Sequence, residues 1–375
     1  MAKASSIFRT LTNLKFSLEK VVFGVNNELV EAKFKGMFVT AVFGKMNISS
    51  GELTFINAGH ESIMVVDKNK NFASAVNNIN IKIKKGSFFG LVGESGSGKT
   101  TLGRAILGAN KISQGNVIFH DDERDYDLTT ITSKEMKDYR KKAQLIFQDP
   151  YAALSPRMTV RDIIAEPLEV MRITNSREET DARVRDIAAK CRLNLEHLRR
   201  FPHAFSGGQR QRISIARALV SNPKFIVADE SVAALDVSIQ ADILNLLKQL
   251  QHELNLTYLF ISHDLSVVAH VCDIVAVMYL GHIVEMAPSR ELFSNPKHPY
   301  TKALLSSIPS IDPENKSKAI ELEGEIPSAM NPPSGCVFRT RCPHASQDGK
   351  EANIEMGLVE VTPGHWVDRC GVNCA

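Results

Sequence analysis

The chain has 375 residues, of which 43% are hydrophobic and 23% are charged, and its formal net charge is +3. This length allows one large core plus extensions, and the composition is that of an ordinary globular protein. The charge is too small to indicate nucleic-acid binding, no apolar run reaches the ~18 residues of a membrane span, and the six cysteines are too irregularly spaced for a disulfide framework.

The first part of the chain, residues 1–71, has a pattern of its own. Its first residues lack the apolar core of a signal peptide, which favours a reducing cytosol. An apolar run over 36–44, a Ser-Ser-Gly turn and an alternating stretch over 51–60 predict a β-hairpin. This pattern resembles part of the PPM-type serine/threonine phosphatases, whose two-metal site is built from aspartates. No aspartate precedes Asp67, so we expect a truncated fragment without phosphatase activity, from a gene fusion or a sequence artefact; an unrelated hairpin is the alternative.

Residues 88–107 predict a strand, a glycine-rich loop and a helix. The loop has the spacing G-x-x-x-x-G-K-[ST] of a phosphate-binding P-loop, in which backbone N–H groups and the helix N-terminus attract a polyphosphate. Lys99 can reach the β- and γ-phosphates, and Thr100 can offer its hydroxyl to Mg²⁺. A glycine-rich turn that binds nothing is the weaker alternative. The residues that we expect to bind ATP here are Gly93, Glu94, Ser95, Gly96, Ser97, Gly98, Lys99, Thr100 and Thr101.

An apolar run over 225–228 ends in two acids, Asp229 and Glu230. Buried parallel strands read this way, and α/β sheets bind ligands at the carboxyl ends of such strands. Asp229 is therefore placed to hold Mg²⁺, and Glu230 to act as a general base toward the attacking water. Taken alone, the pair could equally cap a helix.

A second anion site is predicted at the start of the amphipathic helix over 213–219. It consists of a serine hydroxyl and exposed backbone N–H groups, at Ser206, Gly207, Gly208 and Gln209. One chain does not need two γ-phosphate sites, so this one is expected to serve the nucleotide of a partner subunit. An ordinary helix cap is the alternative.

In this order the motifs resemble those of the ABC-transporter ATPases. Gln148 resembles the Q-loop glutamine, which contacts Mg²⁺ and the attacking water and relays to membrane subunits. Asp236 resembles the D-loop aspartate, and His263 resembles the switch histidine, which contacts the γ-phosphate. The resemblance implies that Thr100, Gln148 and Asp229 hold Mg²⁺, and that Glu230, His263 and Gln148 are catalytic.

The same resemblance implies an α/β fold, a P-loop NTPase domain of the ABC type over residues 72–288. It would contain an antiparallel β subdomain and a helical subdomain over about 149–215, and two such domains would sandwich two ATP molecules. Phe72 is the candidate for stacking on adenine, or else simply a core residue. Ser231 stands where this family usually has proline; because the acid before it is retained, hydrolysis is still expected.

Three further segments, over 146–159, 295–301 and 331–343, resemble the F-type ATP-binding subunits of oligopeptide/dipeptide importers. This implies a peripheral protein on the cytoplasmic face of the plasma membrane, which hydrolyses ATP to drive peptide uptake. Its expected partners are a second ATPase subunit, favoured to be a different chain, two transmembrane permeases and, indirectly, an extracytoplasmic peptide-binding protein. The alternatives are an importer for nickel or oligosaccharide, a soluble non-transport ABC ATPase, a regulatory phosphatase and a subunit that binds ATP without hydrolysing it.

The proline-rich segment over 289–375 predicts an irregular extension, an extended arm with short helices. Its cysteines resemble those that hold a 4Fe–4S cluster in some family members. A cysteine expected soon after Pro343 is missing, so the spacing is altered, and zinc or unligated thiols are the alternatives. The candidate ligands are Cys336, Cys342, Cys370 and Cys374.

Overall fold

The computed structural model describes residues 41–46, 53–58, 75–233, 235–308, 320–329, 331–345 and 350–373. The chain forms two compact units, residues 1–72 and 73–375. In the first unit, β1 (Ala41–Met46) and β2 (Leu53–Ala58) pair antiparallel. Ala41 lies opposite Ala58 and Met46 lies opposite Leu53. The hairpin expected from the alternating pattern is therefore present, with shorter strands.

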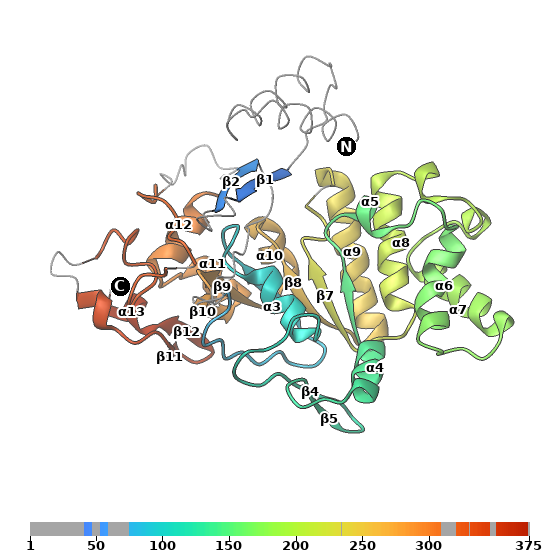
Figure 1. The fold of residues 1–375 in the computed structure, drawn as a ribbon, viewed down its shortest axis with the longest axis horizontal. Helices are drawn as coiled ribbons and strands as arrows, with labels where there is room; N and C mark the ends of the chain where they lie inside the picture. Colours follow the sequence, from blue (N-terminus) through green and yellow to red (C-terminus); the bar gives the residue numbers. More distant parts are fainter. Residues whose placement is uncertain are drawn as a thin grey trace, which may run out of the picture. The chain divides into compact units, whose positions relative to one another are not determined.

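The second unit is built around an eight-stranded sheet in the order β11-β12-β10-β9-β3-β8-β7-β6 (Figure 1). The five strands from β9 to β6 run parallel, whereas β10, β12 and β11 are added antiparallel. A separate short pair, β4 and β5, is antiparallel. The strands are β3 (Phe88–Val92), β4 (Ile118–His120), β5 (Asp125–Asp127), β6 (Ala143–Ile146), β7 (Phe225–Asp229), β8 (Thr257–Ile261), β9 (Ile274–Tyr279), β10 (His282–Pro288), β11 (Leu358–Thr362) and β12 (His365–Asp368).

Helices follow most of the parallel strands, and α5 to α8 form a helical subdomain on the β6 side of the sheet (Figure 1). Polar side chains fix several helix starts: Thr132 and Glu135 form a capping box on α4, and Ser176 caps α7. The helices are α3 (Lys99–Ile106), α4 (Ser133–Lys142), α5 (Pro150–Ala153), α6 (Val160–Val170), α7 (Arg177–Lys190), α8 (Gly207–Leu219), α9 (Val237–Leu254), α10 (Leu265–Val271), α11 (Ser289–Ser294), α12 (Pro299–Ser306) and α13 (Arg369–Asn373). Within the described ranges, no helix is long and apolar enough to cross a bilayer.

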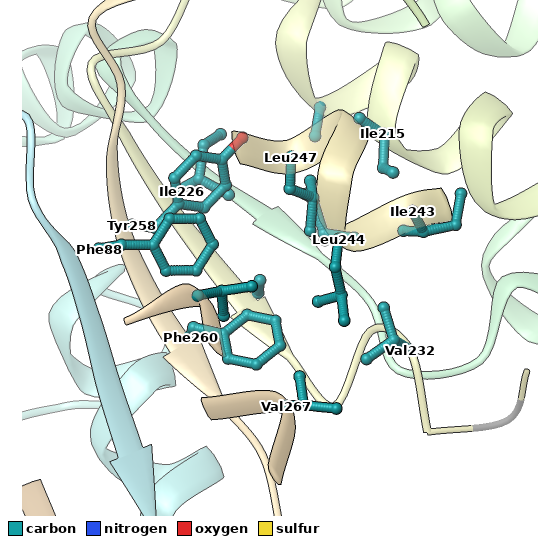
Figure 2. Close-up of a cluster of buried hydrophobic side chains, with 14 of the residues drawn as sticks. Phe88, Ile215, Ile226, Val232, Ile243, Leu244, Leu247, Tyr258, Phe260 and Val267 are labelled. Atoms are coloured by element: carbon teal, nitrogen blue, oxygen red, sulfur yellow. The ribbon is translucent and has the colours of Figure 1, made fainter. Parts of the chain in front are cut away.

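The parallel strands are buried on both faces, so successive side chains enter different cores. Phe88 stacks on Tyr258 at 4.7 Å between ring centroids, and both lie on the face covered by Leu247 of α9 (Figure 2). Phe89 and Leu91 point to the other face, in a second cluster. This two-sided burial holds the carboxyl ends of β3, β7 and β8 together at one edge of the sheet.

The C-terminal extension departs from an extended arm. The sequence predicts only short helices there, whereas β11 and β12 continue the main sheet, with Glu285 of β10 opposite Val367 and Met286 opposite Trp366. Residues 336–338 are buried in the same core as the central strands. The extension is therefore structurally part of the second unit.

Candidate active site

The loop between β3 and α3 requires glycine at two positions where the backbone approaches other segments. A Cβ at Gly93 would lie 2.1 Å from the Met278 carbonyl oxygen, and one at Gly98 would lie 2.2 Å from that of Ala75. Both glycines also have positive φ, 151° and 103°. Gly98 is the N-cap of α3 and provides no side-chain acceptor, so the first N–H groups of this helix are available to an anion.

The Lys99 side chain lies within this loop. Its Nζ donates to the carbonyl oxygens of Gly93 and Glu94, each at 2.8 Å, and to Ser97 Oγ at 3.3 Å. Burial lowers the pKa of Lys99, and the negative charges of Glu230, Asp229 and Glu94 oppose this effect. The ammonium group is thus held where a phosphate on the loop would meet it.

Two oxygen ligands meet beside the loop. Thr100 Oγ1, at the start of α3, donates to Asp229 Oδ1 at the end of β7, at 3.1 Å. Burial raises the pKa of Asp229, against the hydrogen bond from Thr100. A hydroxyl and a carboxylate suit Mg²⁺, which usually binds one or two protein oxygens together with substrate phosphates. Among the described residues, no group of three His, Cys, Asp or Glu side chains could hold a metal ion.

Three segments converge on Glu230. Gln148, which follows β6, donates from Nε2 to Glu230 Oε2 at 2.7 Å. His263, which follows β8, places Nδ1 3.4 Å from Glu230 Oε1. The Glu230 backbone has φ 44°, an unusual value for a non-glycine residue, and its N–H donates to the Ile261 carbonyl at 2.9 Å. A carboxylate held in this way can accept a proton from a neighbouring water.

Ser231, which follows Glu230, carries a hydroxyl group that a proline would lack. Ser231 is buried, and its hydroxyl has no hydrogen-bond partner among the residues that the structure describes. The segment from 229 to 231 therefore contains an unsatisfied polar atom next to a residue in a strained backbone conformation.

Ser206 and Asp236 both begin helices. Ser206 Oγ accepts the Gln209 N–H at 3.4 Å, and Gln209 Oε1 accepts the Ser206 N–H at 3.1 Å, which closes a capping box on α8. Asp236 Oδ1 accepts the Ile239 N–H at 3.0 Å on α9. A Cβ at Gly208 would lie 2.4 Å from Ile239 Cγ2, so this glycine allows the two helix starts to approach each other. Gly207 is the first residue of α8.

The other residues that we expect to bind the nucleotide lie in the loop, in the first turn of α3 or outside the described residues. Ser95 and Gly96 are exposed in the loop, and Thr101 is half-buried in the first turn of α3. Phe72 lies outside the described residues, so its stacking on adenine stays a prediction.

The candidate cluster ligands are only partly described. Cys336 and Cys370 are buried, and a hydrogen bond between their thiols lowers the pKa of Cys336. Cys342 is half-buried, and Cys374 lies outside the described residues. In the part of the chain that the structure describes, no group of three His, Cys, Asp or Glu side chains lies close enough together to hold a metal, and a cluster on these cysteines stays a prediction.

Sequence reasoning missed two residues that contact the P-loop. Arg341 forms an ion pair with Glu94, with 2.8 Å between Nη1 and Oε2, and the Tyr300 hydroxyl accepts the Glu94 N–H at 2.9 Å. Both lie in the C-terminal segments over 295–301 and 331–343, whose sequence indicates a family resemblance and no contact with the P-loop. The partners lie 206 and 247 positions apart in the sequence, so neither contact leaves a local signal.

A groove of about 290 Å³ lies beside the segment that contains Gln148. Its lining includes Phe147, Val170 and Arg217, and the first two side chains are strongly exposed. Arg217 forms an ion pair with Glu166, which also lines the groove, with 2.7 Å between Nη2 and Oε2. An apolar, partly charged groove of this kind suits a short helical segment of another protein.

Three protein families match the chain. The ABC transporter family matches residues 76–233, and the C-terminal region of the oligopeptide/dipeptide transporters matches residues 284–348. The family described as stage II sporulation protein E matches residues 1–99.

Two relatives are similar over most of their length. The oligopeptide transport ATP-binding protein AppF of Bacillus subtilis is 48% identical over 296 residues, which cover 78% of this chain and 88% of AppF. The oligopeptide transport ATP-binding protein OppF of Salmonella typhimurium is 50% identical over 276 residues, which cover 73% of this chain and 81% of OppF.

Solved structures give the same picture of the fold. A dimeric post-hydrolysis state of the ATP-binding cassette MJ0796, bound to ADP and Pi, has a TM-score of 0.51 and 29% identity, and the match covers 67% of this chain and 97% of that one. The cbiO1 protein of Clostridium perfringens, part of the ABC transporter complex cbiONQ, has a TM-score of 0.54 and 28% identity, with coverage of 63% and 89%.

Proposed function

The chain belongs to the ATP-binding subunits of the oligopeptide and dipeptide ABC transporters, and on this premise we propose that it hydrolyses ATP to drive peptide uptake through partner permeases. The observation that carries the proposal is the meeting of Gln148 and His263 on the Glu230 carboxylate, next to the Thr100–Asp229 pair. Four segments far apart in the sequence supply these groups at one edge of the sheet, which is what a hydrolytic site requires and a simple binding loop does not.

In the proposed reaction, the ATP phosphates bind the N–H groups of the P-loop, and the Lys99 ammonium neutralises charge on the β- and γ-phosphates. Glu230 accepts a proton from the attacking water as the new bond from oxygen to the γ-phosphorus forms and the bond to the β–γ bridging oxygen breaks. Gln148 and His263 orient the carboxylate and the water. When bound by Thr100 and Asp229, with Gln148 nearby, Mg²⁺ supplies charge neutralisation to the phosphates. General-base catalysis of this kind contributes about 10²–10⁴-fold.

We propose that hydrolysis occurs in a dimer of two such ATPase subunits. Ser206, Gly207, Gly208 and Gln209 would contact the nucleotide of the partner, with Asp236 at the same interface. The positive end of the α8 dipole, at Gly207 and Gly208, supports an anion contact there, and the similar MJ0796 cassette is described as a dimer. By the resemblance to F-type subunits, the favoured partner is a D-type chain.

The groove beside Gln148 supports docking of a permease. An amphipathic permease segment could place its apolar side against Phe147 and Val170, within reach of the Q-loop that contacts the catalytic carboxylate. In this arrangement the subunit binds two permeases from the cytoplasmic face, and an extracytoplasmic protein delivers the peptide. The solute itself does not contact this chain.

For residues 1–71 we propose no catalytic role. The match to the sporulation protein E family supports a relationship to that family, but the chain has no aspartate before Asp67 for a two-metal site. The β1–β2 hairpin is then an inherited fragment.

Uptake of labelled di- and tetrapeptides tests the proposal. Cells that lack their own copy of the subunit would be complemented with the unaltered chain, with Glu230→Gln or with Glu253→Gln. Glu253 is a matched control, because it is an exposed glutamate on α9 whose contact is to Gln249 of the same helix.

We expect uptake with the unaltered chain and with Glu253→Gln, and none with Glu230→Gln, because an amide cannot serve as the general base. Equal uptake by all three chains would refute the role of Glu230. No uptake by any of them, with each chain present at the membrane, would refute a peptide substrate.

A further inference from the structure

The C-terminal extension holds one residue of the P-loop by both its side chain and its backbone. Arg341 faces the Glu94 carboxylate with two nitrogens, Nη1 at 2.8 Å from Oε2 and Nη2 at 3.4 Å from Oε1. The Tyr300 hydroxyl accepts the Glu94 N–H. The Arg341 side chain is only 8% exposed, so this ion pair is largely shielded from water and salt.

Both residues are held firmly by their surroundings. The rings of Tyr279, Tyr300 and Phe338 form a cluster with centroid distances of 4.7 to 5.4 Å. His298 caps α12 by accepting the Tyr300 N–H at 3.1 Å, and the Arg341 guanidinium lies 6.0 Å from the Tyr279 ring centroid. Burial lowers the pKa of Arg341, but its interactions with Glu94 and Tyr279 together outweigh this effect and raise the pKa, so the guanidinium stays charged.

The charge of Glu94 is a difficulty for a loop that binds a polyanion. An unpaired carboxylate at this position would repel the phosphates that the loop N–H groups and Lys99 attract, and repulsion is strong where water is partly excluded. A guanidinium that faces both carboxylate oxygens neutralises this charge and fixes its direction. The Tyr300 hydroxyl satisfies a loop N–H that would otherwise lack an acceptor.

We propose that Arg341 and Tyr300 are positioning residues of the nucleotide site, which neutralise and immobilise Glu94 so that the P-loop binds ATP with full affinity. The C-terminal extension then contributes to nucleotide binding as well as to folding. This inference rests on nucleotide binding at the P-loop and is independent of which solute the transporter carries.

The test is the affinity of the full-length chain for a non-hydrolysable MgATP analogue, measured by titration calorimetry. Arg341→Met should weaken binding by about tenfold, which corresponds to about 1.4 kcal/mol. It should raise the KM for ATP by a similar factor and change kcat by less than about twofold, because the groups around Glu230 are untouched. Arg339→Met is the matched control, since the Arg339 guanidinium hydrogen-bonds to Ser334 and not to the loop.

The decisive variant removes the charge that Arg341 neutralises. Adding Glu94→Gln to Arg341→Met should return the affinity to within about threefold of the unaltered chain, which a purely structural role of Arg341 would not do. Tyr300→Phe, which keeps the ring, should weaken binding by about threefold and decides the question if Arg341→Met does not fold.

Unchanged affinity in both Arg341→Met and Tyr300→Phe would overturn the proposal, as would a double variant that binds no better than Arg341→Met. If the unaltered chain fails to bind the analogue, nucleotide binding itself is refuted, and this proposal with it.

Discussion

The buried carboxylate of Glu285 allows a quantitative test of how the C-terminal extension is attached. Its Oε1 accepts the Lys297 N–H at 2.7 Å and lies 2.7 Å from His365 Nε2, and its Oε2 accepts the His298 N–H at 2.9 Å. The side chains of Glu285 and His365 are fully buried. One carboxylate of β10 therefore joins the start of α12 and strand β12 to the sheet.

Glu285→Gln keeps the shape of the side chain but replaces one acceptor oxygen with an NH₂ group. At least one of the three groups that donate to Glu285 then faces the NH₂ group of the glutamine, which is also a donor. A hydrogen bond to a charged group contributes about 1.5–3 kcal/mol, and a buried donor without an acceptor costs about 1–3 kcal/mol. We expect the free energy of unfolding of the second unit to fall by about 3 kcal/mol.

The assay is urea unfolding followed by tryptophan fluorescence, because the single tryptophan of the chain, Trp366, lies in β12 opposite Met286. Glu253→Gln, on an exposed helix face, is the control and should change the free energy by less than about 0.5 kcal/mol. Coincident unfolding curves for the two variants would show that the Glu285 network does not anchor the extension, and the reasoning would be wrong.

Three further variants test the nucleotide site and its surroundings. Gly98→Ala should abolish binding of the ATP analogue, since its Cβ would lie 2.2 Å from a backbone oxygen at a φ of 103°; binding within about threefold of normal would contradict this. Ser206→Ala removes the α8 cap, which stabilises the helix by about 1 kcal/mol. It should lower steady-state ATPase activity at least tenfold, because the serine contacts the nucleotide bound to the partner subunit, while an isolated subunit still binds the analogue at its own P-loop. Val170→Glu should reduce co-purification of the permeases with the subunit, whereas Val359→Glu, at an exposed valine of β11 outside the groove, should not; equal recovery would refute docking in the groove.

Much of the fold follows from local sequence signals. The apolar runs over 88–92 and from 225 onward predict strands where the structure has β3 and β7. The first run is followed by the glycines of the P-loop, and the second ends in two acids. The order of motifs along the chain places Gln148, Glu230 and His263 after successive parallel strands, and such strands end at the same edge of a sheet. The approach of these side chains is therefore a consequence of the sheet order.

The attachment of the C-terminal segment could not be predicted in this way. Strands β11 and β12 have five and four residues and lie around a turn with proline and glycine, so their pattern is too short to distinguish from a loop. The contact between Glu94 and Arg341 joins residues 247 positions apart. Nothing in either local sequence specifies the other, because the pairing depends on how β10, α12 and the 336–342 segment pack.

The continuation of the sheet into β12 and β11 has a consequence for how this subunit can be divided. A chain cut after Pro288 would expose the outer side of β10, where Glu285 and Met286 normally pair with β12. Open strand edges recruit other chains, so such a shortened cassette is expected to aggregate and not to remain a minimal soluble ATPase. Chimaeras between related subunits should therefore exchange β10 and everything that follows it as one segment. The exchanged segment should carry an arginine at the position of Arg341, so that the ion pair with Glu94 is kept.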